Sequence, residues 1–334
     1  MQSFSCGTCQ AQVYFENSQC THCGSALAFD SERLMMTATP AGAPVAPLCA
    51  NAVHAACNWL ASPEQQHGFC RACALNETIP YLSDPNNLAA WQDLERAKKR
   101  LIYTLLRFRL PFDDASLPNG RLALAFGEGV MTGHDQGLIT VNVDEADGAE
   151  RERTRQHFDE PYRTLLGHFR HESGHFYWDI LIKDGPLIDR FREIFGDERA
   201  DYAAALDRHY NQGPPTDWPA RFVSAYASMH PWEDWAETWA HYLHMVDVIE
   251  TAQSTRVGID QPSGMRALLP RKRPVAPYAT PPIKKLIAEW TPLSIAMNNL
   301  CRSMGHGDFY PFVMPAAALP KLEMVGDAIR AGRH

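Results

Sequence analysis

Eight of the nine cysteines lie among the first 73 residues of this 334-residue chain, mostly as CxxC pairs. A stretch this short buries too little apolar surface to fold on a core alone, so it needs disulfide bonds or metal ions. The first residues, MQSFSCGTCQ, show neither the basic start nor the apolar run of a signal peptide. We therefore expect a cytoplasmic protein whose thiols stay reduced and bind zinc.

The first cysteine set is regularly spaced. Cys6 and Cys9 are followed, after ten intervening residues, by Cys20 and Cys23. Each CxxC pair can form a tight turn that points two thiolates at one ion, and two such turns complete a tetrahedral zinc site. The sequence predicts a zinc ribbon over residues 1–30 whose folding depends on the metal.

The second cysteine set is less regular. It comprises Cys49, Cys57, Cys70 and Cys73. This spacing predicts a second zinc site inside a cysteine-rich module and linker over residues 31–80, with the Pro- and Ala-rich residues 37–47 as the linker. His54 and His67 are alternative ligands that can replace a cysteine. Cys301, in an apolar helical sequence, is interpreted as a small buried hydrophobic residue.

Composition excludes several classes of protein. The apolar share of 45% and the charged share of 21% are ordinary for a soluble globular protein. The net charge of −8 is spread without a basic block, so nucleic acid is not the expected partner. No run approaches the roughly 18 apolar residues of a membrane span, so no membrane association is expected.

Residues 81–334 are predicted to form a mainly helical domain with a small β-sheet, which makes the whole protein α+β. Helical spacing of apolar residues predicts helices over 84–110, 161–182, 186–212, 231–250 and most of the tail from 281. Strands are predicted over 121–126 and 137–143. Residues 261–282, rich in Pro and basic residues, predict an extended connection. In the first helix, Glu95 is placed to pair with Lys99.

The sequence HExxH occurs inside the helix predicted over 161–182. Its two histidines, His171 and His175, are four residues apart and therefore project from one helical face toward a single zinc ion. Glu172 then lies beside the remaining metal position, where it can act as the general base on a zinc-bound water. His168, three residues before the motif, is expected to pack or to hydrogen-bond a neighbour.

The third zinc ligand is expected further along the chain. Metzincins would need Gly at position 178 and His at position 181, where this chain has Trp178 and Leu181. Downstream, Glu233 and Glu237 lie one helical turn apart, so one can bind zinc while the other orients a ligand. Glu233 is favoured as the ligand and Glu237 as its support, although the spacing leaves the choice open. Asp234 is interpreted as a first-turn residue that complements the helix dipole.

The ExxxE pattern after HExxH resembles that of the glutamate-ligand zincins, including the toxin-type metallopeptidases typified by anthrax lethal factor. In that family a Tyr seven residues before the ligand Glu stabilises the oxyanion, which implies this role for Tyr226. His230 and His241 are alternatives for the same role. The segment GLITVNV, residues 137–143, resembles the edge strand on which zincins hold an extended peptide.

Several segments together, including CNWL, RHESGHFYWD, FGDERADY and HPWEDWAETWAHYLH, resemble the bacterial zinc-binding metallopeptidases that carry an N-terminal zinc ribbon. The chain departs from better understood glutamate zincins because it lacks the NExxSD form of the third-ligand motif. The resemblance implies zinc-dependent hydrolysis of a peptide or protein substrate, with the ribbon recruiting a protein partner or regulating activity. The alternative is a non-catalytic protein- or nucleic-acid-binding protein in which HExxH holds a structural metal. We expect three zinc ions per chain, one catalytic and two structural.

Overall fold

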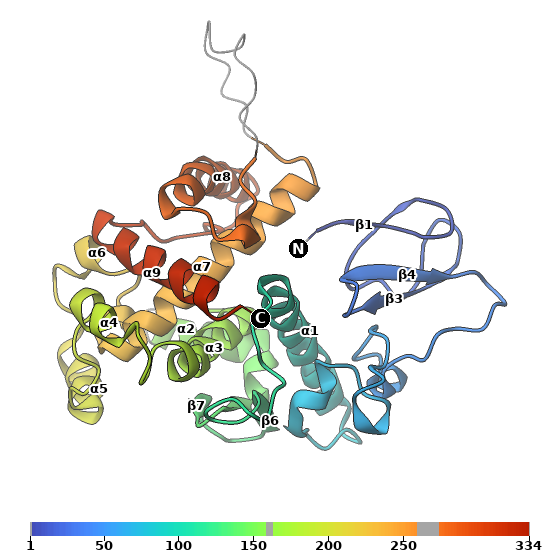
Figure 1. Cartoon of the computed structure of the whole chain (residues 1–334), viewed down its shortest axis with the longest axis horizontal. Helices are drawn as coiled ribbons and strands as arrows, with labels where there is room; N and C mark the ends of the chain where they lie inside the picture. Colours follow the sequence, from blue (N-terminus) through green and yellow to red (C-terminus); the bar gives the residue numbers. More distant parts are fainter. Residues whose placement is uncertain (1, 158–162, 259–273, 334) are drawn as a thin grey trace, which may run out of the picture. The chain divides into compact units, whose positions relative to one another are not determined.

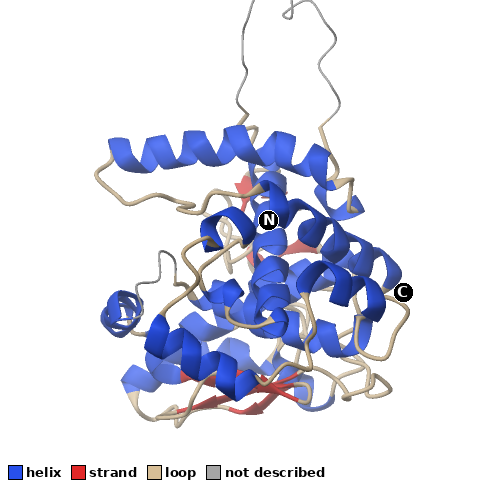
Figure 2. Ribbon diagram, turned by 90° about the vertical axis from the view of Figure 1, so that its left-hand side faces the viewer, coloured by secondary structure: helices blue, strands red, loops and turns tan. Residues whose placement is uncertain are grey.

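The computed structural model describes residues 2–157, 163–258 and 274–333. They form two compact units, which we call the N-terminal unit, residues 3–190 with 331–334, and the C-terminal unit, residues 191–330 with the first two residues. Helices predominate (Figure 2), and every described strand lies in the N-terminal unit. This confirms the predicted α+β class, in which an N-terminal zinc ribbon precedes a mainly helical core with a small sheet.

The N-terminal unit begins with two short antiparallel hairpins (Figure 1). Strand β1 (Phe4–Ser5) pairs with β2 (Gln12–Val13), and β3 (Ala26–Asp30) pairs with β4 (Met35–Thr39). The prediction of a linker from residue 37 is therefore wrong for its first three residues, which complete β4 and leave an irregular connection from Pro40. The β3–β4 hairpin continues across residue 30, where the first domain boundary was predicted. The predicted boundaries after residues 30 and 80 remain predictions.

An aromatic cluster ties the hairpins to the first long helix. The ring of Phe29 lies 4.8 Å from that of Phe15 and 4.9 Å from that of Trp59, and Phe15 also contacts Tyr103 at 5.2 Å. The rings meet edge-on or tilted, as aromatic pairs prefer. Phe4, Leu27 and Met36 are buried beside these rings, but the core of the hairpins stays small, so we expect them to need further support from their cysteine sites.

Helix α1 (Pro85–Phe108) begins at Asp84, whose carboxylate accepts the N–H of Asn86 at 2.8 Å, and ends where Arg109 turns left-handed. The prediction over 84–110 is thus confirmed. The predicted pair of Glu95 with Lys99 is wrong. Glu95 instead lies 2.6 Å from Lys98, and both are fully buried because they face the interior of the unit. The ammonium of Lys99 instead donates a hydrogen bond to the carbonyl of Ala56.

The sheet of the N-terminal unit has the strand order β5-β6-β8-β7. Its strands are β5 (Asn76–Thr78), β6 (Ala123–Gly127), β7 (Gly133–Asp135) and β8 (Leu138–Asn142). Both predicted strands form, as β6 and β8, and they pair in parallel. The interpretation of residues 137–143 as an edge strand is wrong, because β8 lies between β6 and β7. The edge strand on that side of the sheet is β7, which runs antiparallel to β8, and the opposite edge is β5.

Helix α3 (Leu165–Leu181) carries the HExxH sequence and packs against α1 and β7. It begins at Thr164, whose hydroxyl accepts the N–H of Gly167 at 3.0 Å. The buried side chains of Phe169, Phe176 and Tyr177 hold its inner face. The helix α2 (Gly148–His157) precedes it, and the predicted helical residues 161 and 162 lie outside the described residues.

Six further helices are α4 (Ile188–Phe195), α5 (Tyr202–Gln212), α6 (Trp218–Arg221), α7 (Pro231–Ser254), α8 (Ile283–Ser303) and α9 (Leu319–Ala331). The single helix predicted over 186–212 is wrong because Gly196, at a φ of 105°, breaks it into α4 and α5. A side chain at Gly196 would press against Pro231, the first residue of α7. The helices predicted over 231–250 and in the tail are confirmed as α7, α8 and α9.

The extended connection predicted over 261–282 lies largely outside the described residues. Its described end contains a single 3-10 turn, Pro277–Ala279, before α8 begins. Within the parts of the chain that the structure describes, no helix has the length and apolar character needed to cross a membrane.

Candidate metal centres

The two CxxC turns of the ribbon share one backbone geometry. The pair that starts at Cys6 lies between β1 and β2, and the pair that starts at Cys20 precedes β3. Each first cysteine donates its N–H to the carbonyl five residues ahead, at 2.8 Å for Cys6 and 2.9 Å for Cys20. Its carbonyl accepts the N–H of Gln10 or Gly24, both of which have a left-handed backbone, with φ of 62° and 74°. The repeated turn points both thiols of a pair the same way.

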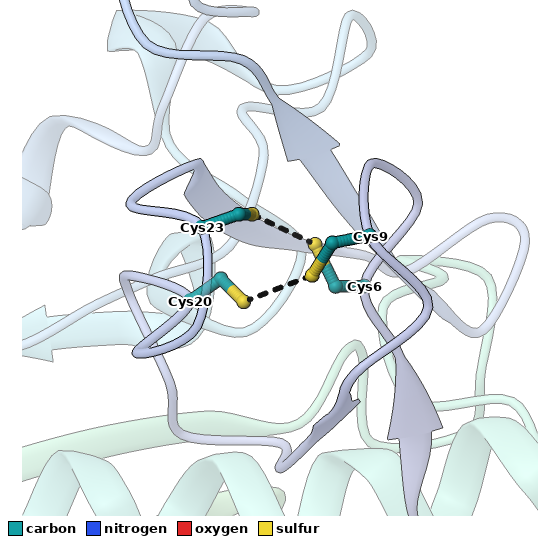
Figure 3. Close-up of side chains that lie close together, drawn as sticks. All are labelled: Cys6, Cys9, Cys20 and Cys23. Atoms are coloured by element: carbon teal, nitrogen blue, oxygen red, sulfur yellow. Dashed lines mark hydrogen bonds between the residues drawn. The ribbon is translucent and has the colours of Figure 1, made fainter.

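The four thiols of the ribbon face one another from these turns (Figure 3). The sulfurs of Cys6 and Cys23 lie 3.8 Å apart, and those of Cys9 and Cys20 lie 3.7 Å apart. A disulfide needs about 2.0 Å, whereas a tetrahedral ion with Zn–S bonds of about 2.3 Å sets its sulfurs about 3.8 Å apart. Hydrogen bonding between Cys23 and Ser25 lowers the pKa of the Cys23 thiol to about 6, which favours its thiolate. The group fits zinc.

The second cysteine set also converges on one point. Its ligand atoms lie within 4.8 Å of one another and belong to four buried residues, Cys49, Cys57, Cys70 and Cys73. Backbone N–H groups point at two of these sulfurs at 3.4 Å, from Cys70 to Cys49 and from Cys73 to Cys70. Such bonds stabilise thiolate charge. His54 and His67 are exposed and stand outside the group, so the four cysteines form the donor set.

The imidazoles of His171 and His175 meet on one face of α3. Their Nε2 atoms lie 3.2 Å apart, and the ring planes cross at 81°. Two imidazoles on one tetrahedral zinc ion, with Zn–N bonds of about 2.0–2.1 Å, set their nitrogens about 3.4 Å apart. The pair is therefore placed to share a metal ion.

The carboxylate of Glu172 lies next to this pair in the sequence and is half-buried. Among the described residues it has neither an ion-pair nor a hydrogen-bond partner. A carboxylate without a partner is free to accept a proton, which is what a general base requires.

The edge strand β7 lies beside the histidine pair. The ring of His134, in β7, stacks on that of His175 at 6.3 Å. The Nε2 of His134 accepts the N–H of Gly137 at 3.0 Å. Burial, with the neighbouring His175, lowers the pKa of His134 to about 3, so this imidazole is neutral. His168 turns to Glu145 at 2.6 Å and hydrogen-bonds a neighbour, as expected.

In the C-terminal unit, the two candidate carboxylates of α7 are held by different hydroxyls. Glu233 is 2% exposed and accepts a hydrogen bond from the phenol of Tyr202 at 2.9 Å. Glu237 accepts one from the hydroxyl of Ser224 at 2.6 Å. Both carboxylates are therefore oriented within their own unit. Sequence reasoning missed both hydroxyls, although Tyr202 ends the segment FGDERADY.

Tyr226 lies in a 3-10 turn, Tyr226–Ser228, close to Glu233. Burial, together with the charge of Glu233, raises the pKa of the Tyr226 phenol well above its usual range, so it stays a hydrogen-bond donor. The two alternative residues are engaged in the fold. His230 caps α7 by accepting the N–H of Trp232 and bonds the carbonyl of Ala200, and the Nδ1 of His241 lies 2.6 Å from the hydroxyl of Tyr310.

Asp234 is a first-turn residue of α7, as predicted, and it also forms a buried ion pair. It lies in the first turn of α7 but is fully buried, and Lys321 of α9 donates to its carboxylate at 2.6 Å. Burial raises the pKa of Asp234 to about 7. This residue therefore belongs to an internal ion pair of the C-terminal unit.

Comparison with known proteins agrees with this geometry. Residues 3–84 match a zinc-ribbon domain family, and residues 87–328 match the family described as "Putative zinc-binding metallo-peptidase". Proteins of Mycobacterium bovis and Mycobacterium tuberculosis, each described as an uncharacterized protein, are 44% identical over 331 residues. These matches cover 97% of this chain and 94% of each relative. No solved structure gives a significant match. The predicted resemblance is confirmed, and the chain is a zinc-binding protein that belongs to this metallopeptidase family.

Proposed function

We propose that the protein hydrolyses peptide bonds with a zinc ion held by His171 and His175. The observation that carries the proposal is the 3.2 Å approach of the two Nε2 atoms, with the carboxylate of Glu172, which has no partner in the described part of the chain, next to them in the same helix. A structural metal site needs no free base beside it. A catalytic one does.

We propose Glu233 as the third ligand. Two imidazoles and one carboxylate are a common donor set of catalytic zinc, and His171, His175 and Glu233 would supply this set. The bond from Tyr202 fixes the orientation of the Glu233 carboxylate. Glu237, held by Ser224, is the proposed supporting residue.

Zinc held by this set would supply an activated water and a polarised carbonyl. Glu172 would then take the proton of that water and pass it to the leaving amine. The phenol of Tyr226, which burial keeps protonated, would donate to the developing oxyanion.

The proposed substrate is an extended peptide or protein segment. The described residues leave one side of β7 without a strand partner, and this edge lies beside α3. An extended chain can add to such an edge by main-chain hydrogen bonds, which places its backbone near the histidines. The two cysteine sites would hold structural zinc, which gives three zinc ions per chain. The ribbon would recruit a protein partner or regulate the activity. The cytoplasmic location stays a prediction.

The substitution Glu172→Gln tests the proposal. Loss of the base should lower cleavage of a quenched fluorescent peptide library about 100- to 10,000-fold while the zinc content stays unchanged. Glu193→Gln, an exposed carboxylate of α4, is the matched control and should cleave normally. Unchanged cleavage by Glu172→Gln with zinc retained would instead support the non-catalytic reading of the site.

A further inference from the structure

A cavity in the N-terminal unit is separate from the histidine site. Its volume is about 290 Å³, and it opens where the β3–β4 hairpin, residues 45–60 and α1 meet. None of the residues assigned above to catalysis lines it. The proposed hydrolysis therefore assigns no role to this cavity.

One buried cation of this lining, Lys99, has no ion pair with a carboxylate among the described residues. Lys99 is 6% exposed, and its ammonium donates to the carbonyl of Ala56 at 2.6 Å. An ammonium carries three N–H donors, and this is its one hydrogen bond to the described residues. Burial of an ammonium without an anion is costly, and two donors remain to be satisfied.

The other charged side chains of the lining are already paired. Glu16 lies 2.7 Å from Arg100, and Arg96 lies 2.5 Å from Asp93. Neither pair includes Lys99. Cys57 of the second cysteine set also lines the cavity, so either its thiolate or a bound anion would balance the ammonium of Lys99.

The remaining walls combine apolar side chains, among them Ala28, Leu48, Ala52 and Leu60, with polar ones, among them Ser18, Thr37, Asn58 and Gln92. A single ammonium beside these aliphatic side chains suits a carboxylate with a small hydrocarbon group. The volume of about 290 Å³ lies near the lower end for ligand pockets, so the ligand is small or is the end of a chain.

We propose that this cavity binds a carboxylate attached to a small aliphatic group, with Lys99 as the anion-binding residue. Two sources share this chemistry. One is a free branched carboxylic acid, and the other is the C-terminal residue of a peptide. The site does not depend on hydrolysis at the histidine pair.

Calorimetric titration of the full zinc-loaded protein tests the proposal. The probes are isovalerate, N-acetyl-alanylleucine and the amide of that dipeptide. At least one of the two acids should bind with a Kd of about 1 mM. The amide lacks the negative charge and should bind at least about tenfold more weakly. A preference for the dipeptide acid identifies a chain end as the ligand, and a preference for isovalerate identifies a free acid.

Two variants assign the binding to this cavity. Lys99→Met keeps the length of the side chain but removes the charge, and should weaken acid binding about 10- to 100-fold. Ala52→Leu keeps Lys99 but fills the cavity, and should abolish binding. Lys285→Met, an exposed lysine of α8, is the control and should bind normally.

Zinc content, measured on every variant, separates the proposal from its rival. If Lys99 instead balances the thiolates of the nearby second cysteine site, Lys99→Met will lose zinc. That result would overturn the proposal, as would equal binding of acid and amide, or unchanged binding in both variants. Absence of binding by the wild-type protein up to about 20 mM of either acid would overturn it as well.

Discussion

The cysteine sites and the histidine pair use metal-binding residues in opposite ways. Around the cysteines, structure is sparse: β1 and β2 have two residues each, and the ligands sit on irregular turns. The histidines sit on α3, a 17-residue helix with its own cap at Thr164 and a buried inner face. We therefore expect that zinc holds the cysteine turns in their fold, whereas the fold of α3 positions the histidines for zinc.

The two kinds of site should therefore respond differently when the metal is lost. A module without a sufficient core draws its folding free energy from the ion. A helix packed through buried aromatic side chains keeps its shape without one. Three experiments can break or sharpen the contrast, beginning with the largest expected effect.

Cys70→Ser should unfold the second cysteine module. Cys70 is fully buried and contacts the sulfur of Cys57 at 3.7 Å. Structural zinc contributes about 10–16 kcal/mol in zinc-finger peptides, so loss of one ligand should cost several kcal/mol. Zinc per chain should fall by one, and hydrogen exchange over residues 45–80 should speed up while α3 stays protected.

The matched control is Cys301→Ser, since Cys301 is a half-buried thiol outside both sites. It should change neither zinc content nor exchange. Slow exchange over 45–80 in zinc-free Cys70→Ser would show that the module has a core of its own, and the contrast would fail.

Lys321→Met should destabilise the helical C-terminal unit without any loss of zinc. It leaves Asp234 buried with no cation, which costs about 3–5 kcal/mol when the carboxyl is charged. The pKa of Asp234, raised by burial to about 7, lies above its unfolded value, so the folded state binds the extra proton. The stability that this proton brings is present at low pH and is lost as pH rises toward 7.

The cost of Lys321→Met should therefore be large at pH 8 and small at pH 5, where Asp234 is protonated and needs no partner. Urea unfolding at both pH values measures it. Arg302→Met removes a pair with Asp308 whose arginine side chain is 61% exposed, and should cost less than about 1 kcal/mol at either pH. An equal cost for Lys321→Met at both pH values would contradict the assignment.

The same contrast explains which features the sequence could predict. Ligand spacing within a turn is a local property, so both cysteine sets and the HExxH pair were predictable from it. Long helices such as α1 and α7 were predictable because their apolar periodicity extends over many residues. The class and the family followed from these features together.

Features that depend on tertiary contacts were not predictable. Strand β7, of three residues, is too short to show alternation, so the edge was assigned to β8. The choice of Lys98 over Lys99 as the partner of Glu95 depends on which side of α1 is covered. Gly196 looks like any loop or helix glycine until its φ of 105° is known. The hydroxyls of Tyr202 and Ser224 come from segments distant in sequence from the carboxylates they hold.

The smallest predicted effect separates the two carboxylates of α7. If Glu233 is the third ligand, Glu233→Gln should weaken zinc binding at the histidine site more than Glu237→Gln does, because loss of a supporting residue costs only about 10- to 100-fold. Competition with a zinc chelator, after saturation of the cysteine sites, measures the affinity of the remaining ion. Neither variant should change the thermal stability of the ribbon, since the cysteine sites keep all their ligands. A larger loss for Glu237→Gln would exchange the two roles, and no loss in either variant would leave the histidines with a ligand from another residue.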